Sequence, residues 1–341
     1  MKINIFWLII CCPFFVFSQS GGNSYQFLNI ETSSRSNAMG GDLISIDDND
    51  ISLAFTTPSL ISSNMHNNFS LDYIDYFSDI NIASFQFSHK IKDFAAILIG
   101  IKSVNYGDFQ GTNEIGEIES VFSASDKVFS LGIGKKILKN ISFGLNLNLL
   151  NSSYAEYQSA IFTSNMSSTY SNIDKSFSAT FMAKNLGGKI SSYTNSSEYI
   201  PFELQFGLSK RLQHLPFRYS LVFHNLQKYN IGNEFSLLTQ TNSETGLLTE
   251  INESFAKICL RHLILSGELA LFKNNLFVQG GLNFQRRFDM SLSTFSTLNG
   301  FSFGIGINLS NFKMNYSRSS YHVSGQMNSF SIMTNLSTFG L

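Results

Sequence analysis

The chain has 341 residues, of which only 14% are charged and 14% are aromatic, and its formal net charge is -1. Soluble domains carry roughly 25% charged residues, so this composition argues against an ordinary soluble protein, and the balanced charge gives no reason to expect nucleic acid as a partner. The chain also lacks the run of about 18 apolar residues that a spanning helix needs. Low charge without a helical span is typical of a β-barrel, whose apolar face is spread over alternate residues.

Residues 1–18 read as a signal peptide. Lys2 forms a short basic region, residues 3–17 are mostly apolar, and Val16 and Ser18 occupy the positions that favour cleavage before Gln19. The apolar stretch is short for a membrane anchor. We therefore expect the protein to be exported.

Two cysteines, Cys11 and Cys12, lie within this apolar stretch and raise the alternative of a lipoprotein. The preceding residue, Ile10, is larger than lipoprotein processing prefers, so a removed signal peptide is the favoured interpretation. Cys259 is then the one remaining thiol, and no intramolecular disulfide is expected.

Residues 19–68 form an irregular segment that is rich in Ser, Asn, Gly and Asp, and we interpret it as a plug or hatch. Its acidic cluster, Asp47 to Asp50, could bind a hard cation through oxygen ligands. It lacks the spacing of a calcium-binding hand and the bidentate Glu that ends one. A turn with solvated carboxylates is the favoured interpretation, and neither a metal site nor a cofactor is predicted.

From residue 69 to 341 the chain alternates apolar and polar residues. In NISFGLNLNL (140–149) and FSFGIGINLS (301–310) the period is two, which is the period of a β-strand, and the polar positions are small and uncharged. The pattern predicts a transmembrane antiparallel barrel of fourteen strands, at 69–77, 80–90, 93–106, 126–137, 140–154, 158–170, 175–186, 199–211, 216–228, 256–271, 275–288, 299–310, 311–320 and 326–338.

The lengths of the predicted joins support this fold. Short joins alternate with long polar ones, and the long joins fall at 107–125, 187–198, 229–255 and 289–298. Outer-membrane barrels have short periplasmic turns and longer extracellular loops, so the alternation fits a chain that starts in the periplasm. The alternative is a soluble β-sandwich, which would present Lys, Glu and Thr to water, whereas the polar positions here are mostly Ser, Asn, Gly and Gln.

Charged residues within the predicted strands should face the lumen, pair with one another or lie near a rim, because a lipid-facing Arg at mid-depth costs about 2–4 kcal/mol. These residues are Arg261, Glu268, Arg286, Arg287 and Arg318. We expect Glu268 to pair with an arginine of segment 275–288. Such a lining is more often structural than part of a substrate channel.

Catalytic signals are weak. The six histidines form no HExxH or similar metal-binding spacing. Serine is so abundant that a Ser–His pair is expected by chance, so a membrane hydrolase is the least favoured function. We predict that the protein is not an enzyme.

Several pieces of the sequence occur together in a recognisable order. They include SRSNAMGG (34–41), the 48–50 region, HNNFSLDYIDYFSDIN (66–81), NYGDFQGTNEIGE (105–117), RHLILSGELAL (261–271) and MNYSRSSYHVSGQMNSFSI (314–332). In this order they resemble the PorQ family of outer-membrane proteins, which belongs to the type IX secretion system of Bacteroidota. One departure is Thr57-Pro58-Ser59, where the family usually has Asn-Pro-Ala.

The resemblance implies a barrel like those of the FadL fatty-acid transporters, with the N-terminal segment folded into the lumen. It also implies a role in the attachment complex, where a PorZ-like surface protein would be held beside PorU and PorV in the outer-membrane lipid. The long loops 107–125 and 229–255 would offer apolar contacts to this partner, at Ile115, Ile118, Phe235, Leu237 and Leu247. The alternative function is a FadL-like channel for hydrophobic small molecules, because the same architecture serves both.

Overall fold

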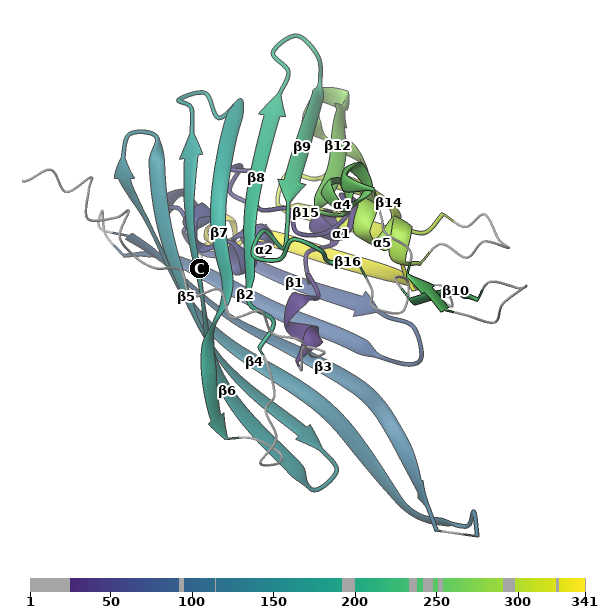
Figure 1. Cartoon of the computed structure of the whole chain (residues 1–341). Helices are drawn as coiled ribbons and strands as arrows, with labels where there is room; N and C mark the ends of the chain where they lie inside the picture. The colour runs from purple at the N-terminus through teal and green to yellow at the C-terminus, as the bar shows by residue number, and fades with distance from the viewer. Residues whose placement is uncertain are drawn as a thin grey trace, which may run out of the picture.

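The computed structural model describes residues 25–91, 95–113, 115–191, 200–232, 238–241, 248–250, 254–290, 298–322 and 325–340. Within these ranges fourteen antiparallel strands form one closed barrel, in which β1 pairs with both β2 and β16 (Figure 1). The predicted all-β barrel is therefore confirmed. The predicted signal peptide, residues 1–18, lies outside the described residues.

The strands of the wall follow the predicted segments closely along most of the chain. They are β1 (Asn68–Asp75), β2 (Asn81–Ile91), β3 (Ala95–Thr112), β4 (Ile118–Leu138), β5 (Ile141–Tyr154), β6 (Tyr157–Ser171), β7 (Phe177–Ser191), β8 (Glu203–Arg211), β9 (Phe217–Phe223), β12 (Leu263–Leu271), β13 (Leu276–Asn283), β14 (Phe301–Asn308), β15 (Phe312–His322) and β16 (Gly325–Asn335). A separate hairpin of β10 (Leu238–Thr241) and β11 (Leu248–Glu250) lies outside the barrel sheet.

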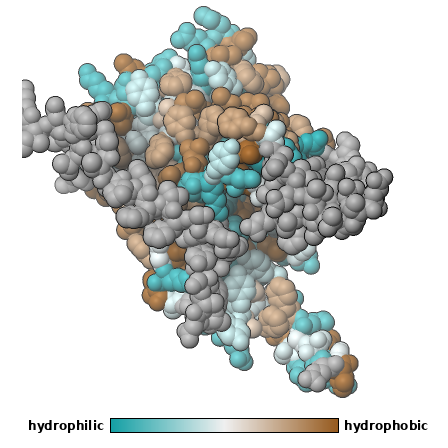
Figure 2. All heavy atoms as spheres, viewed as in Figure 1, coloured by the Kyte–Doolittle hydropathy of each residue, from teal (hydrophilic) through white to brown (hydrophobic). Residues whose placement is uncertain are grey.

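The period-two pattern sorts side chains between the two faces of the wall. On β5 the polar Asn146 and Asn148 are buried inside the barrel, whereas Phe143 and Leu147 are exposed on its outer surface. On the face shown in Figure 2, hydrophobic residues gather over the outside of the strands in the upper middle of the view. Such an exterior is suited to lipid rather than to water. No helix in the described ranges is long and apolar enough to cross a membrane.

Two predicted strands begin or end differently, because local capping signals override the alternation. Segment 256–271 starts as helix α4 (Phe255–Arg261), whose N-cap Ser254 accepts a hydrogen bond from the Lys257 N–H. Segment 275–288 ends as helix α5 (Phe284–Asp289), whose N-cap Asn283 accepts one from the Arg286 N–H. The strands are short in this part of the wall: β8, β9, β12, β13 and β14 have 7 to 9 residues each.

The predicted loop at 107–125 is also wrong, because most of it is strand. β3 runs for 18 residues and β4 for 21, so only residues 113–117 separate them. The hairpin therefore runs well beyond its neighbours, to the lower right of Figure 1.

The N-terminal segment fills the interior of the barrel, and we call residues 25–66 the plug. Its short helices are η2 (Gln26–Asn29), α1 (Ser34–Ala38), α2 (Ile51–Thr56), η3 (Pro58–Leu60) and η4 (Ser63–Met65). Its apolar side chains pack together, and the lumen-facing Leu98 of the wall joins the same buried cluster. Two further 3-10 turns, η5 (Phe272–Asn274) and η6 (Leu336–Phe339), lie in the turn after β12 and after β16.

The two ends of the barrel differ. The plug enters β1 at the end that carries short turns such as 139–140 and 212–216, which we call the short-turn end. The opposite end carries joins such as 224–262 and 284–300, and we call it the long-join end. Of the four long joins predicted from the sequence, those after β7, β9 and β13 are long and the β3–β4 join is not. The β5–β6 join, at the same end, is only residues 155–156.

Candidate functional site

The contact between the plug and the inner wall is the most chemically elaborate part of the molecule. Its centre is Arg35 of α1, a helix that starts at the N-cap Ser33, whose hydroxyl accepts from the Ser36 N–H at 3.3 Å. The guanidinium of Arg35 makes a bidentate pair with Glu268 of β12, with Nε and Nη2 each 2.8 Å from a carboxylate oxygen. This planar arrangement is the strongest geometry available to an Arg–carboxylate pair.

The same guanidinium also holds the acidic cluster of the plug. Arg35 Nη2 lies 2.8 Å from Asp48 and Nη1 lies 3.1 Å from Asp50, while Arg218 of β9 approaches Asp48 at 2.8 Å. Arg218 also lies 3.5 Å from Glu268, so the network carries two positive and three negative groups and joins the plug to two strands. We call these five residues the Arg35 cluster.

Electrostatics favour the charged forms of Arg35 and Asp48. Burial by itself would raise the pKa of Asp48, but Arg35 and Arg218 outweigh it and hold that pKa well below its usual range. Burial would likewise lower the pKa of Arg35, and the carboxylates of Asp48, Glu268 and Asp50 instead hold it well above its usual value. A buried ion-pair network of this kind fixes geometry, because breaking one partner leaves a buried charge uncompensated.

A second buried cluster attaches the plug to β7. Lys184 is 2% exposed at its side chain, and its Nζ lies 2.9 Å from Glu31 and 3.1 Å from Asp42, both of the plug. Gln205 of β8 donates a further hydrogen bond to Asp42 at 3.0 Å. Burial would raise the pKa of Asp42, but Lys184 opposes it most strongly and the pKa is lowered.

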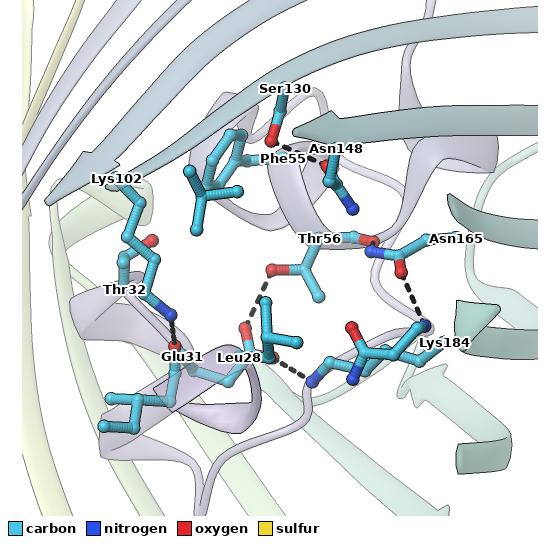
Figure 3. Close-up of a pocket in the computed structure, with 13 residues that line it drawn as sticks. Leu28, Glu31, Thr32, Phe55, Thr56, Lys102, Ser130, Asn148, Asn165 and Lys184 are labelled. Carbon is cyan, nitrogen blue, oxygen red and sulfur yellow. Dashed lines mark hydrogen bonds and ion pairs between the residues drawn. The ribbon is translucent and has the colours of Figure 1, made fainter. Parts of the chain in front are cut away.

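A small cavity with a mixed polar and apolar lining remains beside this second cluster (Figure 3). It leaves about 40 Å³ for the centres of water molecules, which is room for a few waters and too little for a hydrocarbon of the size of toluene. Lys102 of β3 closes one side by donating from Nζ to the carbonyl oxygens of Phe27 and Ile30, at 2.8 and 2.6 Å. Polar side chains from both the wall and the plug line it, among them Asn148, Asn165 and Thr56.

Glycines of the wall let the plug backbone approach closely. A Cβ at Gly144 of β5 would lie 2.0 Å from the carbonyl carbon of Pro58, and one at Gly281 of β13 would lie 2.2 Å from that of Met39. Next to Pro58, the Ser59 N–H donates to Ser167 Oγ at 2.8 Å, and Ser59 Oγ lies 2.7 Å from Thr169 Oγ1. In Thr57-Pro58-Ser59, where the family that the chain resembles usually has Asn-Pro-Ala, the Ser59 hydroxyl therefore makes a hydrogen bond to the wall.

The acidic stretch of the plug differs from both interpretations of the sequence. Asp48 and Asp50 are paired with arginines, and Asp47 lies 2.8 Å from Lys175, so the carboxylates are not simply solvated. In the described part of the chain, no three His, Cys, Asp or Glu side chains are placed to hold a metal ion.

Among the charged residues expected in the wall, Glu268 does face the lumen, but its partners are Arg35 and Arg218 rather than an arginine of 275–288. The other arginines lie elsewhere. Arg261 belongs to α4 and pairs with Asp289, and Arg286 and Arg287 belong to α5. Arg318 lies on the outward face of β15 towards the long-join end and donates to Gln326.

Sequence reasoning missed Arg35, Lys184 and Arg218 as a group. A signal was present for the two in strands, because Lys184 and Arg218 lie within predicted segments 175–186 and 216–228 at alternate, lumen-facing positions. Arg35 lies in the SRSNAMGG stretch, where nothing local indicates a partner more than two hundred residues away.

Two of the five residues expected to contact a partner can be placed. Ile115 lies in the turn between β3 and β4 and is 79% exposed, and Ile118 is the first residue of β4 and is 60% exposed. Phe235, Leu237 and Leu247 fall outside the residues whose side chains are described. Their role in binding stays a prediction.

Comparison with known proteins identifies a similar fold but does not identify the function. No protein-family model matches the chain, and no curated protein matches it in sequence. Among solved structures, the toluene transporter TbuX of Ralstonia pickettii superposes with a TM-score of 0.52 at 11% identity, covering 90% of this chain and 99% of that one. The described barrel thus shares its fold with TbuX.

Two further solved structures superpose less closely. The toluene transporter TodX of Pseudomonas putida gives a TM-score of 0.49 at 13% identity, covering 89% of this chain and 97% of that one. A FadL homologue of Pseudomonas aeruginosa gives 0.47 at 10% identity, covering 89% and 98%.

Proposed function

We propose that the protein is an outer-membrane barrel that acts as a non-enzymatic docking platform in type IX secretion. In this role it would hold a PorZ-like surface protein in the attachment complex, beside PorU and PorV. The location is supported by the closed barrel and by its apolar outer face, and the secretion role is supported by the order of motifs that resemble the PorQ family.

The observation that carries the platform function is the way the lumen is filled. The Arg35 cluster and the Lys184 cluster tie the plug to β7, β9 and β12, and the plug backbone lies directly on glycines of β5 and β13. A barrel that only supports a partner gains from such a rigid interior. A channel for hydrophobic molecules needs a continuous apolar passage, whereas the cavity described beside Lys102 and Lys184 is small and has these two charged side chains in its lining.

A second candidate function is a channel for hydrophobic small molecules. The comparisons by themselves favour it over the platform, because TbuX, whose fold this chain shares, is a toluene transporter. In that case the plug would have to move for passage, and the ion-paired clusters would hold its closed state.

One experiment separates the two functions. The tagged protein is recovered from detergent-solubilised outer membranes, its co-purifying proteins are identified by mass spectrometry, and its bound lipids and hydrocarbons are analysed by extraction. A matched variant that lacks residues 229–255 but still inserts serves as the comparison.

Capture of a PorZ-like protein without a stoichiometric hydrophobic ligand is the result expected for a platform. Recovery of a hydrophobic small molecule in the barrel, with no secretion partner in either sample, would instead establish the channel and overturn the platform. Loss of the partner in the 229–255 variant alone would also place the contact in that join.

A further inference from the structure

The β3–β4 hairpin continues past the rim of the barrel as a two-stranded ribbon. The last pair between β2 and β3 is Asn81 with Asn105, and the first pair between β4 and β5 is Ala124 with Tyr154. Beyond these pairs and one backbone hydrogen bond from the Ala155 N–H to the Ser123 carbonyl oxygen, the described ends of β3 and β4 are paired only with each other. We call residues 106–113 and 115–123 the ribbon, and its far end projects at the lower right of Figures 1 and 2.

The base of the ribbon is held rigidly. The hydroxyls of Tyr106 and Tyr154 both donate to Asp126 Oδ2, at 2.6 and 2.8 Å, and the two rings lie 5.7 Å apart. Asp126 itself is fully buried. Side-chain hydrogen bonds therefore join β3, β4 and β5 where the ribbon leaves the wall. The direction of the ribbon is thus fixed in the free barrel.

Both faces of the ribbon expose large apolar side chains. Phe109 and Phe122 pair across the strands and stack with their ring centroids 5.5 Å apart, yet they are 42% and 38% exposed. Phe122 lies on the same face of β4 as the buried Ala124 and Asp126, so the two rings continue the lumen-facing side of the wall above the mouth of the barrel. The opposite face presents Val121, which is 66% exposed.

The exposed apolar side chains of the ribbon indicate that another molecule covers them. A two-stranded ribbon is marginally stable by itself in water, and unpaired strand edges with exposed apolar residues bind other chains. The sequence from 106 to 123 holds four acidic residues, Asp108, Glu114, Glu117 and Glu119, and no Lys or Arg. An anionic lipid surface would repel this charge, whereas a basic protein surface would be attracted to it.

We infer that the ribbon is the docking arm of the barrel and that its occupant is a protein with an apolar, basic face seated against Phe109 and Phe122 above the mouth. This inference rests on the proposed platform function, because a simple channel needs no such partner. The stacked rings are the anchor, since aromatic side chains near the centre of an interface carry most of its binding energy. The acidic residues around them speed association and select a basic partner.

The test begins with photo-crosslinking in native outer membranes. Benzoylphenylalanine replaces Phe109 in one protein and Phe272 in a second one, since Phe272 is 76% exposed at the short-turn end. The expected result is one protein adduct at position 109 and none of that protein at position 272. A crosslink to lipid, a crosslink to a second copy of this chain, or no adduct at all would overturn the inference.

The crosslinked protein is then purified and titrated against folded barrels of four kinds. We expect Phe109→Ser with Phe122→Ser to weaken binding by about tenfold or more, while Phe272→Ser leaves it unchanged. Reversal of charge by Asp108→Lys with Glu119→Lys should also weaken binding, and added salt should weaken binding to the wild type. Equal affinity of the Phe109/Phe122 variant and the wild type would overturn the inference.

The two proposals fail in distinguishable ways. If the wild-type barrel captures a secretion partner but the ribbon variants capture it equally well, the docking arm is wrong and the platform stands. If the wild type captures no secretion partner, the platform is wrong as well. Folding of each variant is checked by the shift in gel mobility between heated and unheated barrel.

Discussion

At the scale of single residues, Arg35 is the most connected side chain of the plug. Its five nitrogen–oxygen contacts reach Asp48, Asp50 and Glu268, and it is 8% exposed. Two of these carboxylates come from the plug and one from β12. Arg35 therefore links the plug to β12 by ion pairs, although the two are far apart in the sequence.

Removing the Arg35 guanidinium should weaken the attachment of the plug to the wall. We expect Arg35→Met to destabilise the docked plug by about 3–5 kcal/mol, because the buried carboxylates of Asp50 and Glu268 lose their main counter-charge. Arg211→Met is the matched control, since Arg211 is exposed and makes its contact with Asn274 at the short-turn end. The measurement is hydrogen exchange at the amides of α1 and α2, and equal protection in both variants would contradict the role of Arg35.

The depressed pKa of Asp48 predicts how plug docking depends on pH. A carboxyl whose pKa is lower in the folded state contributes stability above its unfolded pKa of about 3.9, and this stability is lost as the pH falls below that value. Protection of α1 and α2, corrected for intrinsic exchange, should thus be steady from about pH 7 to 5 and decline below about pH 4. Asp48→Asn should lower the protection at neutral pH and flatten the decline, and an unchanged decline in this variant would assign it to other groups.

At the scale of elements, the contact between η3 and β5 depends on a missing side chain. Gly144 faces Pro58 so closely that a Cβ would meet the plug backbone rather than a flexible side-chain end. Because the backbone of β5 faces the backbone of Pro58 and Ser59, neither side can move away easily. The glycine in the NISFGLNLNL run is therefore required by the plug and not by the strand itself.

A single methyl group at this position should push η3 off the wall. We expect Gly144→Ala to cost about 1–3 kcal/mol of plug docking, which is the usual range for overpacking a tight site. Gly188→Ala on β7 is the control, because a Cβ there meets nothing within 4 Å. Limited proteolysis between α2 and β1 measures the effect, and equal cleavage of the two variants would show that η3 adjusts freely.

At the scale of the whole molecule, the barrel and the plug have separate requirements. The wall closes through hydrogen bonds between neighbouring strands, whereas the plug adds buried ion pairs and an apolar cluster inside it. The wall should therefore form without the plug, although several lumen-facing charges would then lie in water.

Deletion of the plug should open the lumen. We expect the barrel lacking residues 25–66 to conduct ions in a planar bilayer, and the wild type to conduct far less, because the plug contacts β5, β7, β9 and β12 around the interior. Heat-dependent gel mobility confirms that the deletion variant is a folded barrel. Equal conductance of the two folded proteins would mean that the plug does not seal the lumen.

Much of the architecture could be predicted from local pattern. The alternation in segments such as 140–149 and 301–310 identified the strands and their faces, because a strand in a barrel wall needs apolar residues on every second position. The pattern failed at α4 and α5, where capping residues stop or delay a strand. It also failed at 107–125, because the ribbon extends beyond the neighbouring strands and carries no apolar–polar alternation to mark it as strand.

The sequence by itself determined the barrel, the place of most of its strands and the inward position of Glu268, since these follow from a period of two along a single strand. Only the tertiary structure decided which charges meet. Arg35, Asp48 and Glu268 are separated by up to 233 residues, and their pairing depends on how the plug is placed inside the closed wall. The tertiary structure likewise turned a predicted loop into a rigid ribbon, because strand pairing and the shared Asp126 anchor extend β3 and β4 beyond the rim.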